Sequence, residues 1–466
     1  MSAPSSSRAI AIVGGGLSGA LVAVHLLRLA PPGTHIVIVE RHPPIGRGVA
    51  YGTDRPEHLL NVPVNRLSAW PDDPDHFLRW VRERLGRLGY PDTAEGTDFL
   101  PRSIFGDYIA HVFTTARQEA SRDVRLESIA GEVIDIEERA GGKARIVLAD
   151  TRTFEVDRVV LALGNLPGEY PIRKSLRFYH GRHYVHTPWN PDVLEGIRRT
   201  DDVLIVGQGL TGHDIIAQLD QLGHVGTIHA LSRRGLRPKV HEPAQAWPPF
   251  LAGHAVPRTV RALLHAVRAE VRKAEAAGVG WRAVIDALRP QSPELWTAFS
   301  WEERSRFMRH VRPYWEIHRH RIPPPTAALI DRRVREGRLK FYAGSLESLA
   351  ETPDGYAQAI FRRRGTADWV RLKVAKVINC TGSRSDYSKY QHPLLINLLA
   401  RGLIDHDPLA LGIHAMPGGE VFRYRDGLVG WLYTLGAPLK GVLWECTAVP
   451  EIRSHALSLA RVLLAS

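Results

Sequence analysis

The chain has 466 residues, 44% of them hydrophobic and 24% charged, which is enough for two or three globular domains with a sizeable core. Its formal net charge of +12 at pH 7 is carried mainly by arginines spread along the sequence, which favours a basic enzyme with anionic ligands over a nucleic-acid-binding protein. Two cysteines, Cys380 and Cys446, exclude a disulfide framework, and they lie in neither a Cys-x-x-Cys pair nor a metal-ligand spacing. With no recognisable signal peptide or transmembrane helix, we expect a cytoplasmic protein without a membrane partner.

The first predicted element is a strand at Ala9–Val13, followed by a glycine-rich turn and an apolar-periodic helix. The turn reads Gly14-Gly15-Gly16-Leu17-Ser18-Gly19, a Gly-x-Gly-x-x-Gly fingerprint. In a dinucleotide-binding unit, the first glycine permits the sharp turn, the second lets the backbone approach a pyrophosphate, and the third lets helix and strand pack closely. The pyrophosphate then lies on the helix N-terminus.

A second predicted strand, His35–Val39, ends in Glu40, which lies 21 residues after Gly19. A carboxylate in this position accepts hydrogen bonds from the ribose hydroxyls. A lone glycine fingerprint also occurs in structural loops, but the strand, helix, second strand and acid together favour nucleotide binding.

Two loops rich in glycine and proline follow, Arg41–Tyr51 and His58–Pro63. Loops in this position run back across the bound cofactor, so Arg41, Arg47 and Asn61 are candidates for contacting it; ordinary turns are the alternative.

The next elements are predicted to complete most of the first domain. Residues 75–85 and 103–120 have helical periodicity. Residues 124–136 and 144–156 alternate like antiparallel strands joined by a turn at Gly141-Gly142. A buried-type strand from Arg158 ends in Gly164 and returns the chain to the first sheet.

A second fingerprint occurs about 193 residues after the first, where a strand at Asp202–Val206 runs into Gly207-Gln208-Gly209-Leu210-Thr211-Gly212. A helix and a strand at Thr227–Leu231 follow, and Ser232-Arg233-Arg234 takes the place that Glu40 has in the first unit. An acid there favours a bare ribose, whereas serine and arginine hold a 2′-phosphate. The pair of sites therefore indicates FAD first and NADPH second; a solvated turn is the alternative for the two arginines.

Residues 241–325 differ in composition and are predicted to form a helical insertion, with helices at 260–276 and 281–288. Ser300-Trp301-Glu302-Glu303 is a capping box for a helix that continues towards Tyr314, and Pro323–Pro325 ends the region. Trp296, Trp301, Tyr314 and Trp315 either line a pocket for a flat substrate or belong to the core. His318 and His320 are two residues apart, on different faces of a helix, so no metal site is expected.

The last part of the chain is predicted to return to the first domain through buried strands at Ala375–Gly382 and Gly430–Gly436. The final helix, from Val449 to Leu464, either directs its N-terminus at the flavin's pyrimidine edge or simply docks on the domain. The expected fold is a three-layer α/β fold with two Rossmann-like dinucleotide-binding domains. The FAD domain comprises residues 1–170 and 376–466, and the NADPH domain comprises residues 171–375, including the insertion.

Several segments carry a family resemblance. The chain resembles the FAD/NAD(P)-binding proteins of the flavin-monooxygenase and N-hydroxylase kind, and more narrowly a bacterial group that includes an FAD-dependent urate hydroxylase. The resemblance covers essentially the whole chain, and its more selective parts are Gly-Val-Ala-Tyr and Pro-Glu-Ile-Arg. The segments are Gly14–Gly16, Arg47–Tyr51, Leu59–Pro63, Asn379–Gly382 and Trp444–Arg453.

The resemblance implies that NADPH reduces FAD, that dioxygen adds to the reduced flavin, and that the resulting hydroperoxide hydroxylates a small polar or anionic substrate, with urate as a candidate. It implies that FAD is held through its ADP part by Gly14, Gly16, Gly19 and Glu40, through its isoalloxazine by Gly48, Ala50, Leu60 and Asn61, and through its adenine by the backbone of Val133. Gly15, Leu17, Ser18, Arg41, Arg47 and Gly164 complete the candidate FAD set, and NADPH is assigned to Gly207, Gly209, Gly212, Arg233 and Arg234.

No catalytic side chain is assigned, because the cofactor carries the difficult chemistry. A helical insertion with five tryptophans is a suitable cover for a site that must exclude water. Two other functions stay open: a flavin-dependent NAD(P)H oxidoreductase that passes electrons to a protein or quinone, and a non-catalytic flavin-binding protein.

Overall fold

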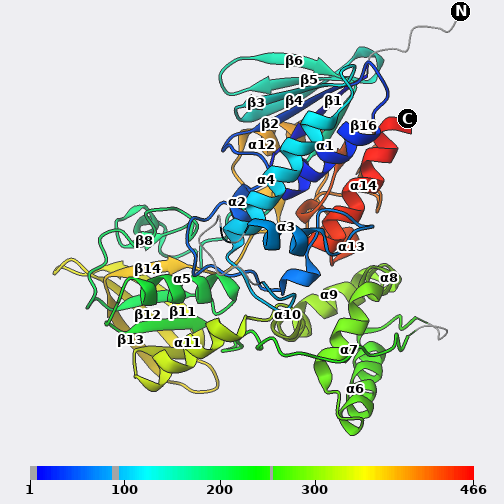
Figure 1. The fold of residues 1–466 in the computed structure, drawn as a ribbon. Coiled ribbons are helices and arrows are strands. Elements are labelled where there is room, and N and C mark those ends of the chain that lie inside the picture. The colour runs from blue at the N-terminus through cyan, green and yellow to red at the C-terminus, as the bar shows by residue number, and fades with distance from the viewer. Residues whose placement is uncertain (1–7, 85, 87–93, 252–255, 466) are drawn as a thin grey trace, which may run out of the picture.

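The computed structural model describes residues 8–84, 86, 94–251 and 256–465. The Ser-rich stretch at residues 1–7 lies outside the described residues. Leu85, the last residue of a predicted helix, does so as well. Two mixed sheets, each built around one of the glycine-rich turns, are joined to a helical insertion (Figure 1). The predicted fold class is confirmed.

The first sheet has six strands in the order β15–β16–β7–β1–β2–β3, and all neighbours are parallel except β15 and β16. The strands at its centre are apolar runs buried on both faces, as expected for a covered parallel sheet. Its strands are β1 (Ala9–Val13), β2 (His35–Glu40), β3 (Arg125–Ala130), β7 (Arg158–Leu161), β15 (Glu420–Arg423) and β16 (Gly427–Thr434).

This sheet is the middle of three layers. Ile10 and Ile12 point to a layer of helices, and Ala11 and Val13 point to a small antiparallel sheet on the other face. Each fully buried isoleucine contributes about 1.5–3 kcal/mol to stability. The helical layer contains α1 (Leu17–Leu29), α3 (His76–Arg84), α4 (Arg102–Glu119) and α14 (Val449–Ala465); the opposite layer contains β4 (Val133–Arg139), β5 (Lys143–Leu148), β6 (Thr153–Val156) and α12 (Pro393–Ala400).

The second sheet has seven strands in the order β13–β12–β11–β10–β9–β14–β8. The long strand β11 pairs in parallel with β10 along its first part and antiparallel with β12 along its second part. Helices α5 (Leu210–Gln221) and α11 (Pro324–Arg335) cover one face. Its strands are β8 (Tyr184–Val185), β9 (Val203–Val206), β10 (Ile228–Ser232), β11 (Leu339–Glu351), β12 (Ala357–Arg363), β13 (Trp369–Val374) and β14 (Lys376–Asn379).

The insertion leaves and rejoins the second domain at one place. Val240 and Ile322 form a parallel bridge, in which His241 N–H donates to the Ile322 carbonyl and Ile322 N–H donates to the Lys239 carbonyl, both at 2.9 Å. Between these residues lie α6 (Val260–Ala276), α7 (Trp281–Leu288), α8 (Ser292–Ala298), α9 (Trp301–His310) and α10 (Arg312–Arg319).

The N-cap part of the predicted capping box is confirmed, because the Ser300 hydroxyl accepts a hydrogen bond from Glu303 N–H at 3.3 Å; the Glu303 carboxylate is instead engaged by Val260 N–H and Arg306. The prediction that this helix continues to Tyr314 is wrong: α9 ends at His310 and α10 begins at Arg312. Proline in the first turn of α10 lacks the N–H that a continuous helix would need there.

Short elements complete the described chain. They are the helices α2 (Gly48–Tyr51) and α13 (Lys440–Leu443) and the 3₁₀ turns Val64–Arg66, Ala140–Gly142, Leu176–His180, Arg289–Gln291, Tyr387–Lys389 and Ala437–Leu439.

Two further predictions about strands need correction. The expected strand 124–136 is two strands, because the chain leaves the first sheet after Ala130, where Gly131 N–H donates to the Glu40 carbonyl at 3.1 Å. Its first part, β3, is parallel to β2; only β4, the second part, pairs antiparallel with β5 across the predicted turn at Gly141. The expected strand 144–156 is likewise divided into β5 and β6.

The strand predicted at Ala375–Gly382 was assigned to the first domain, and this is wrong. It is β14, which pairs in parallel with β9 in the second sheet. The chain therefore returns to the first domain after Asn379, and the later strand, β16, joins the first sheet as predicted, where it pairs with β7.

Candidate nucleotide-binding sites

The first glycine turn is fixed by two close approaches of its backbone. Gly14 has φ +103°, and a Cβ there would lie 2.4 Å from the carbonyl oxygen of Ala162, which follows β7. A Cβ on Gly19 would lie 1.9 Å from the Gly14 carbonyl oxygen. Any side chain at either position would force the turn apart, so both places require glycine.

The N-terminus of α1 is open to an anion. Gly16 is its N-cap residue, and no side chain caps the helix. A Cβ on Gly16 would meet only the Cα of Gly48, at 3.5 Å. Two glycine backbones therefore face each other beside uncapped N–H groups, which is the arrangement that a pyrophosphate needs. The residues present fit the phosphates of a dinucleotide.

Glu40 lies beside this turn, at the carboxyl end of β2. Its carboxylate accepts hydrogen bonds from Gly15 N–H at 2.6 Å and His42 N–H at 2.8 Å. These bonds fix the carboxylate, and each oxygen keeps a second lone pair for a ribose hydroxyl. Because Glu40 is paired with Ala130, the start of β4 at Val133 lies close to the same end of the sheet.

Two predicted contacts with the cofactor have other partners in the structure. Arg41 forms an exposed ion pair with Glu132 at 3.4 Å, and Arg47 is paired with Asp107 of α4. Both arginines lie next to the glycine turn, where Gly46 N–H donates to the Gly15 carbonyl at 2.7 Å.

The residues predicted to border the isoalloxazine lie on two segments that both contact α4. Ala50 and its neighbour Val49, 56% exposed, are on α2, which packs on α4. Leu60 is buried, and its N–H donates to the Leu100 carbonyl at 2.8 Å, which fixes the Leu60–Asn61 segment beside the start of α4. Gly164 follows β7 with φ +63°, and its carbonyl accepts a hydrogen bond from the Tyr387 hydroxyl at 3.0 Å.

The second glycine turn repeats the construction of the first. Gly207 has φ +120°, and a Cβ there would lie 2.0 Å from the Cys380 carbonyl oxygen, just after β14. A Cβ on Gly212 would lie 2.6 Å from the Gly207 carbonyl oxygen. Gly209 is the uncapped N-cap of α5 and has no atom within 4 Å of its Cβ position. This helix N-terminus also fits a pyrophosphate.

Gln208, in a variable position of the fingerprint, is a structural residue that the sequence analysis missed. Its buried amide donates to the carbonyls of Ala230 and Tyr342 at 2.7 and 2.9 Å, and it accepts from the Ser232 hydroxyl at 3.1 Å. The Ser232 hydroxyl in turn accepts from Gly235 N–H at 3.0 Å. Gln208 therefore fixes the turn that carries the two predicted phosphate-binding arginines.

Those two arginines differ in their surroundings. Arg233 is exposed and forms no ion pair within the described part of the chain. Arg234 donates to the Arg309 carbonyl of α9 at 3.0 Å, so it already links the turn to the insertion. Of the two, Arg233 is the freer to hold a 2′-phosphate.

An ion pair joins the two nucleotide domains. Arg102, at the start of α4, lies 2.9 Å from Asp214, which is two residues after Gly212, and their side chains are 15% and 14% exposed. Burial raises the pKa of Asp214 to about 6, although Arg102 opposes the shift. The Arg102 guanidinium also lies 4.9 Å from the centre of the Trp189 ring. No sequence motif marks this pair.

His241 is a second residue that the sequence analysis missed. It follows the point where the insertion begins, its ring lies 5.3 Å from that of Phe99, and it is hydrogen-bonded to the backbone of Asn61. Burial, reinforced by Arg321, lowers the pKa of His241 to about 4, so the ring is neutral at physiological pH.

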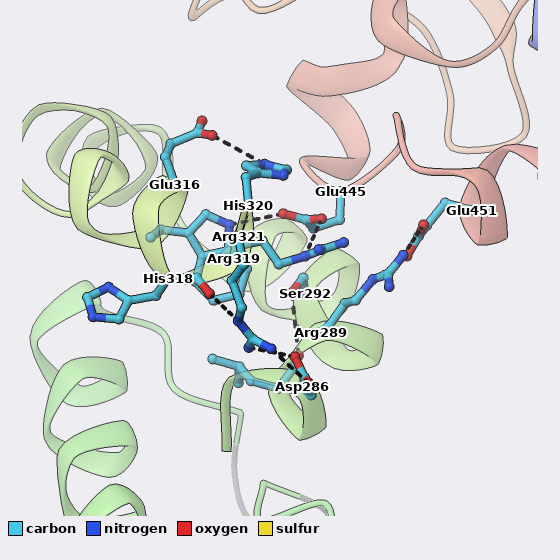
Figure 2. A network of polar contacts seen from close by, with 12 residues as sticks. Asp286, Arg289, Ser292, Glu316, His318, Arg319, His320, Arg321, Glu445 and Glu451 are labelled. Carbon is cyan, nitrogen blue, oxygen red and sulfur yellow. Dashed lines mark hydrogen bonds and ion pairs between the residues drawn. The ribbon is translucent and has the colours of Figure 1, made fainter. Parts of the chain in front are cut away.

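A network of polar contacts attaches the insertion to Glu445, which precedes α14, and to Glu451 in the first turn of α14 (Figure 2). Arg289 makes two hydrogen bonds to Glu451, at 2.8 and 2.6 Å. Arg319 pairs with Glu445 at 3.2 Å, and both side chains are 8% exposed. Trp315 Nε1 donates to the same carboxylate at 2.9 Å. Burial lowers the pKa of Arg319, and the negative charge of Glu445 opposes this shift.

The four aromatic residues that were candidates for a substrate pocket do not line one pocket. Trp296 is buried and stacks on Trp444 with ring centres 4.9 Å apart, whereas Trp301 and Tyr314 are exposed. Trp315 belongs to the polar network. The alternative interpretation, a place in the core, therefore holds for Trp296 but not for Trp301 and Tyr314.

Neither a metal centre nor a membrane span is found in the described ranges. His318 Nδ1 donates to the Tyr314 carbonyl at 2.7 Å, and His320 pairs with Glu316 at 3.2 Å. No cluster of three or more His, Cys, Asp or Glu side chains suited to a metal ion occurs among residues 8–84, 86, 94–251 and 256–465. Within the same ranges, every helix is too short or too polar to cross a bilayer.

Comparison with known proteins agrees with this geometry. Residues 11–166, which include the first glycine turn and Glu40, match the family model described as FAD-NAD(P)-binding. No curated protein has significant sequence similarity to the chain.

Three solved structures are similar over nearly the whole length. The ornithine hydroxylase of Pseudomonas aeruginosa has a TM-score of 0.64 at 16% identity, covering 98% of this chain and 99% of its own. The L-lysine 6-monooxygenase of Pseudomonas syringae has a TM-score of 0.63 at 17% identity, with 98% and 99% covered. The cadaverine monooxygenase of Erwinia amylovora has a TM-score of 0.65 at 11% identity, with 98% and 94% covered.

At these identities the likeness establishes the fold. The chain has an FAD/NAD(P)-binding segment and shares its fold with these three enzymes.

Proposed function

We propose that this protein is an FAD-dependent, NADPH-using monooxygenase that hydroxylates a small polar substrate. The observation that carries the proposal is the repeated construction of the two glycine turns. Each lies where a strand order reverses, between β7 and β1 or between β14 and β9, and dinucleotides bind at such switch points. Glu40 beside one turn and Arg233 beside the other suit FAD and NADPH respectively.

Each cofactor would be held by the residues proposed for its parts. Gly16 and Gly48 would border the FAD pyrophosphate, Glu40 would bind the ribose, and the Val133 backbone would meet the adenine. Gly209 and Arg233 would hold NADPH through its pyrophosphate and 2′-phosphate. When bound, reduced FAD supplies the activation of dioxygen, of which one oxygen atom enters the substrate and the other becomes water.

We propose a primary amine as the substrate class. The three similar structures belong to enzymes named for ornithine, lysine and cadaverine, all of which carry primary amines. His241 supports this choice. A neutral imidazole that donates one N–H to the Asn61 carbonyl carries an acceptor lone pair on its second nitrogen, which suits a substrate N–H group beside the predicted isoalloxazine border.

The test is NADPH oxidation by the purified protein in air, with ornithine, lysine, cadaverine and urate as substrates and with peroxide and hydroxylated product quantified in parallel. We expect one of the amines to accelerate NADPH oxidation while peroxide stays low and an N-hydroxylated product accumulates. If urate alone accelerates NADPH oxidation, the protein would be assigned to the bacterial group that includes an FAD-dependent urate hydroxylase. NADPH oxidation that yields only peroxide with every compound would favour the electron-transferring oxidoreductase.

The cofactor preference depends on Arg233. We expect Arg233→Ala to raise the dissociation constant for NADPH by about 10- to 100-fold, because a charge-assisted contact with the 2′-phosphate contributes about 1.5–3 kcal/mol. The constant for NADH should stay nearly unchanged. Stopped-flow reduction of the flavin over a range of each nucleotide measures both values.

Arg234→Ala is the matched control, because this arginine is engaged by the Arg309 carbonyl. It should affect NADPH less than Arg233→Ala does. Equal losses for NADPH and NADH in the Arg233 variant would remove the 2′-phosphate assignment.

A further inference from the structure

A groove runs between α6 and α9 on the insertion. Its volume is about 250 Å³, and its floor is formed by Val260, Leu264 and Val311. Val260 is 3% exposed, and the other two side chains are half-buried. Figure 1 shows α6 at the end of the insertion that lies farthest from the first sheet. None of the residues that line the groove is among those assigned to either proposed cofactor.

Basic side chains surround this apolar floor. Arg261, His265 and Arg268 lie along one face of α6, with Arg306 and His310 of α9 opposite them. All five are exposed. Only Arg306 has an ion-pair partner among the described residues, so the other two arginines keep uncompensated positive charge at the groove.

That partner is Glu303, and both of its carboxylate oxygens are engaged. One oxygen accepts from Val260 N–H at 2.7 Å, where it helps to cap α6, and the other pairs with Arg306. Glu303 therefore helps to hold the two helices together and does not neutralise Arg261 or Arg268. An apolar floor with an unneutralised cationic rim is complementary to a ligand with an apolar centre and anionic flanks.

We propose that this groove docks an acidic amphipathic helix of a partner protein, with an aliphatic side chain on the floor and carboxylates against Arg261 and Arg268. Helix-in-groove recognition uses apolar anchors one turn apart, and the two floor residues of α6 are spaced by four. The proposal depends only on the insertion and is independent of the proposed monooxygenase activity.

Other occupants fit the groove less well. A small-molecule site usually encloses about 300–1,000 Å³ and buries most of its ligand, whereas this rim is exposed. The groove lining contains no Phe, Tyr or Trp ring on which a nucleic-acid base would stack. A second copy of a chain with net charge +12 would bring like charges together. A membrane is disfavoured because no large apolar side chain of α6 is exposed.

The test measures binding of a fluorescein-labelled peptide to the full-length protein by fluorescence anisotropy. The peptide has about 18 residues of leucine, glutamate and alanine, with leucines on one helical face and glutamates flanking them. A second peptide of the same pattern has glutamine in place of glutamate. We expect the acidic peptide to bind and the glutamine peptide to bind at least about tenfold more weakly.

The decisive comparison is between Arg268→Glu and Arg272→Glu. Both make the same charge change on exposed positions of α6, one turn apart, but only Arg268 borders the groove. Arg268→Glu should raise the dissociation constant about tenfold or more, and Arg272→Glu less than about threefold. Unchanged melting temperature and flavin content verify that both variants are folded.

Equal effects of the two variants would overturn the proposal, because they would indicate general attraction to a basic protein. Undiminished binding of the glutamine peptide would overturn it as well. Tighter binding of a short single-stranded RNA, lost in Arg268→Glu, would replace the acidic helix with a nucleic acid. A dimer of the protein that Arg268→Glu dissociates would replace it with a second copy.

Discussion

Replacing Gly16 with valine should yield a folded protein that purifies without FAD. The protein itself leaves room for the first atom of a side chain, since a Cβ on Gly16 meets only the Cα of Gly48 at 3.5 Å. The two further methyl carbons of valine would occupy the space where the pyrophosphate approaches the N-terminus of α1. Flavin absorbance per polypeptide should fall to a small fraction of the wild-type value while the far-ultraviolet circular dichroism is kept.

Gly19→Ala is the informative contrast. Its added Cβ would lie 1.9 Å from the Gly14 carbonyl oxygen, so α1 would have to move away from β1. Overpacking of this kind destabilises a protein by about 1–3 kcal/mol or more. We expect this variant to lose melting temperature as well as flavin. A yellow Gly16→Val protein with wild-type flavin content would contradict the assignment of the first turn to FAD.

Replacing Glu445 with alanine should destabilise the protein by about 3–5 kcal/mol, because it leaves the Arg319 charge buried without its partner. Both side chains of this pair are only 8% exposed, so solvent screens the interaction little. The same substitution removes the acceptor of the Trp315 indole. Urea unfolding followed by tryptophan fluorescence measures the loss, and hydrogen exchange of α10 locates it.

Two controls separate the charge from the packing. Glu451→Ala breaks the Arg289 pair, whose side chains are 23% and 25% exposed, and should cost less than Glu445→Ala does. The double variant Arg319→Met with Glu445→Leu removes both charges and should recover most of the stability, since apolar replacement of a buried pair is often neutral. A double variant as unstable as Glu445→Ala would show that the pair matters through its shape and not its charge.

The parts of the fold that could be predicted from the sequence are those with strict local requirements. At Gly14 and Gly207, a positive φ and a neighbouring carbonyl leave no room for a side chain, so the sequence must show glycine there. Glu40 could be found from its position in the sequence, 21 residues after Gly19 of the first turn. The cofactor order of the two sites follows from residues in the same relative position, and it stays a prediction until nucleotides are titrated.

The wrong predictions concern which sheet a strand joins and where a strand ends, and nearby residues in the sequence do not determine either. The apolar strand at Lys376–Asn379 is equally suited to either sheet, and only its pairing with β9 decides between them. Residues 124–136 are divided into β3 and β4 because the chain passes from the first sheet to the small antiparallel sheet between them. The alternation of apolar and polar residues does not indicate where this passage occurs.

The site residues that were missed act over long separations in the sequence. Arg102 and Asp214 come from different domains, and His241 reaches Asn61 from the start of the insertion. Gln208 lay inside the fingerprint, but its variable position gave no reason to assign it a structural role.

The bridge between Val240 and Ile322 has a consequence for how this architecture can change. Because the insertion departs and returns through adjacent residues, the second sheet would meet the same boundary whatever lies between them. The helices from α6 to α10 can therefore vary in length and number without shifting β10 or β11, provided that a replacement also supplies partners for Glu445 and Glu451. Surface recognition could thus diversify within the insertion, whereas the Arg309 carbonyl that accepts from Arg234 ties α9 to the turn that would hold the 2′-phosphate.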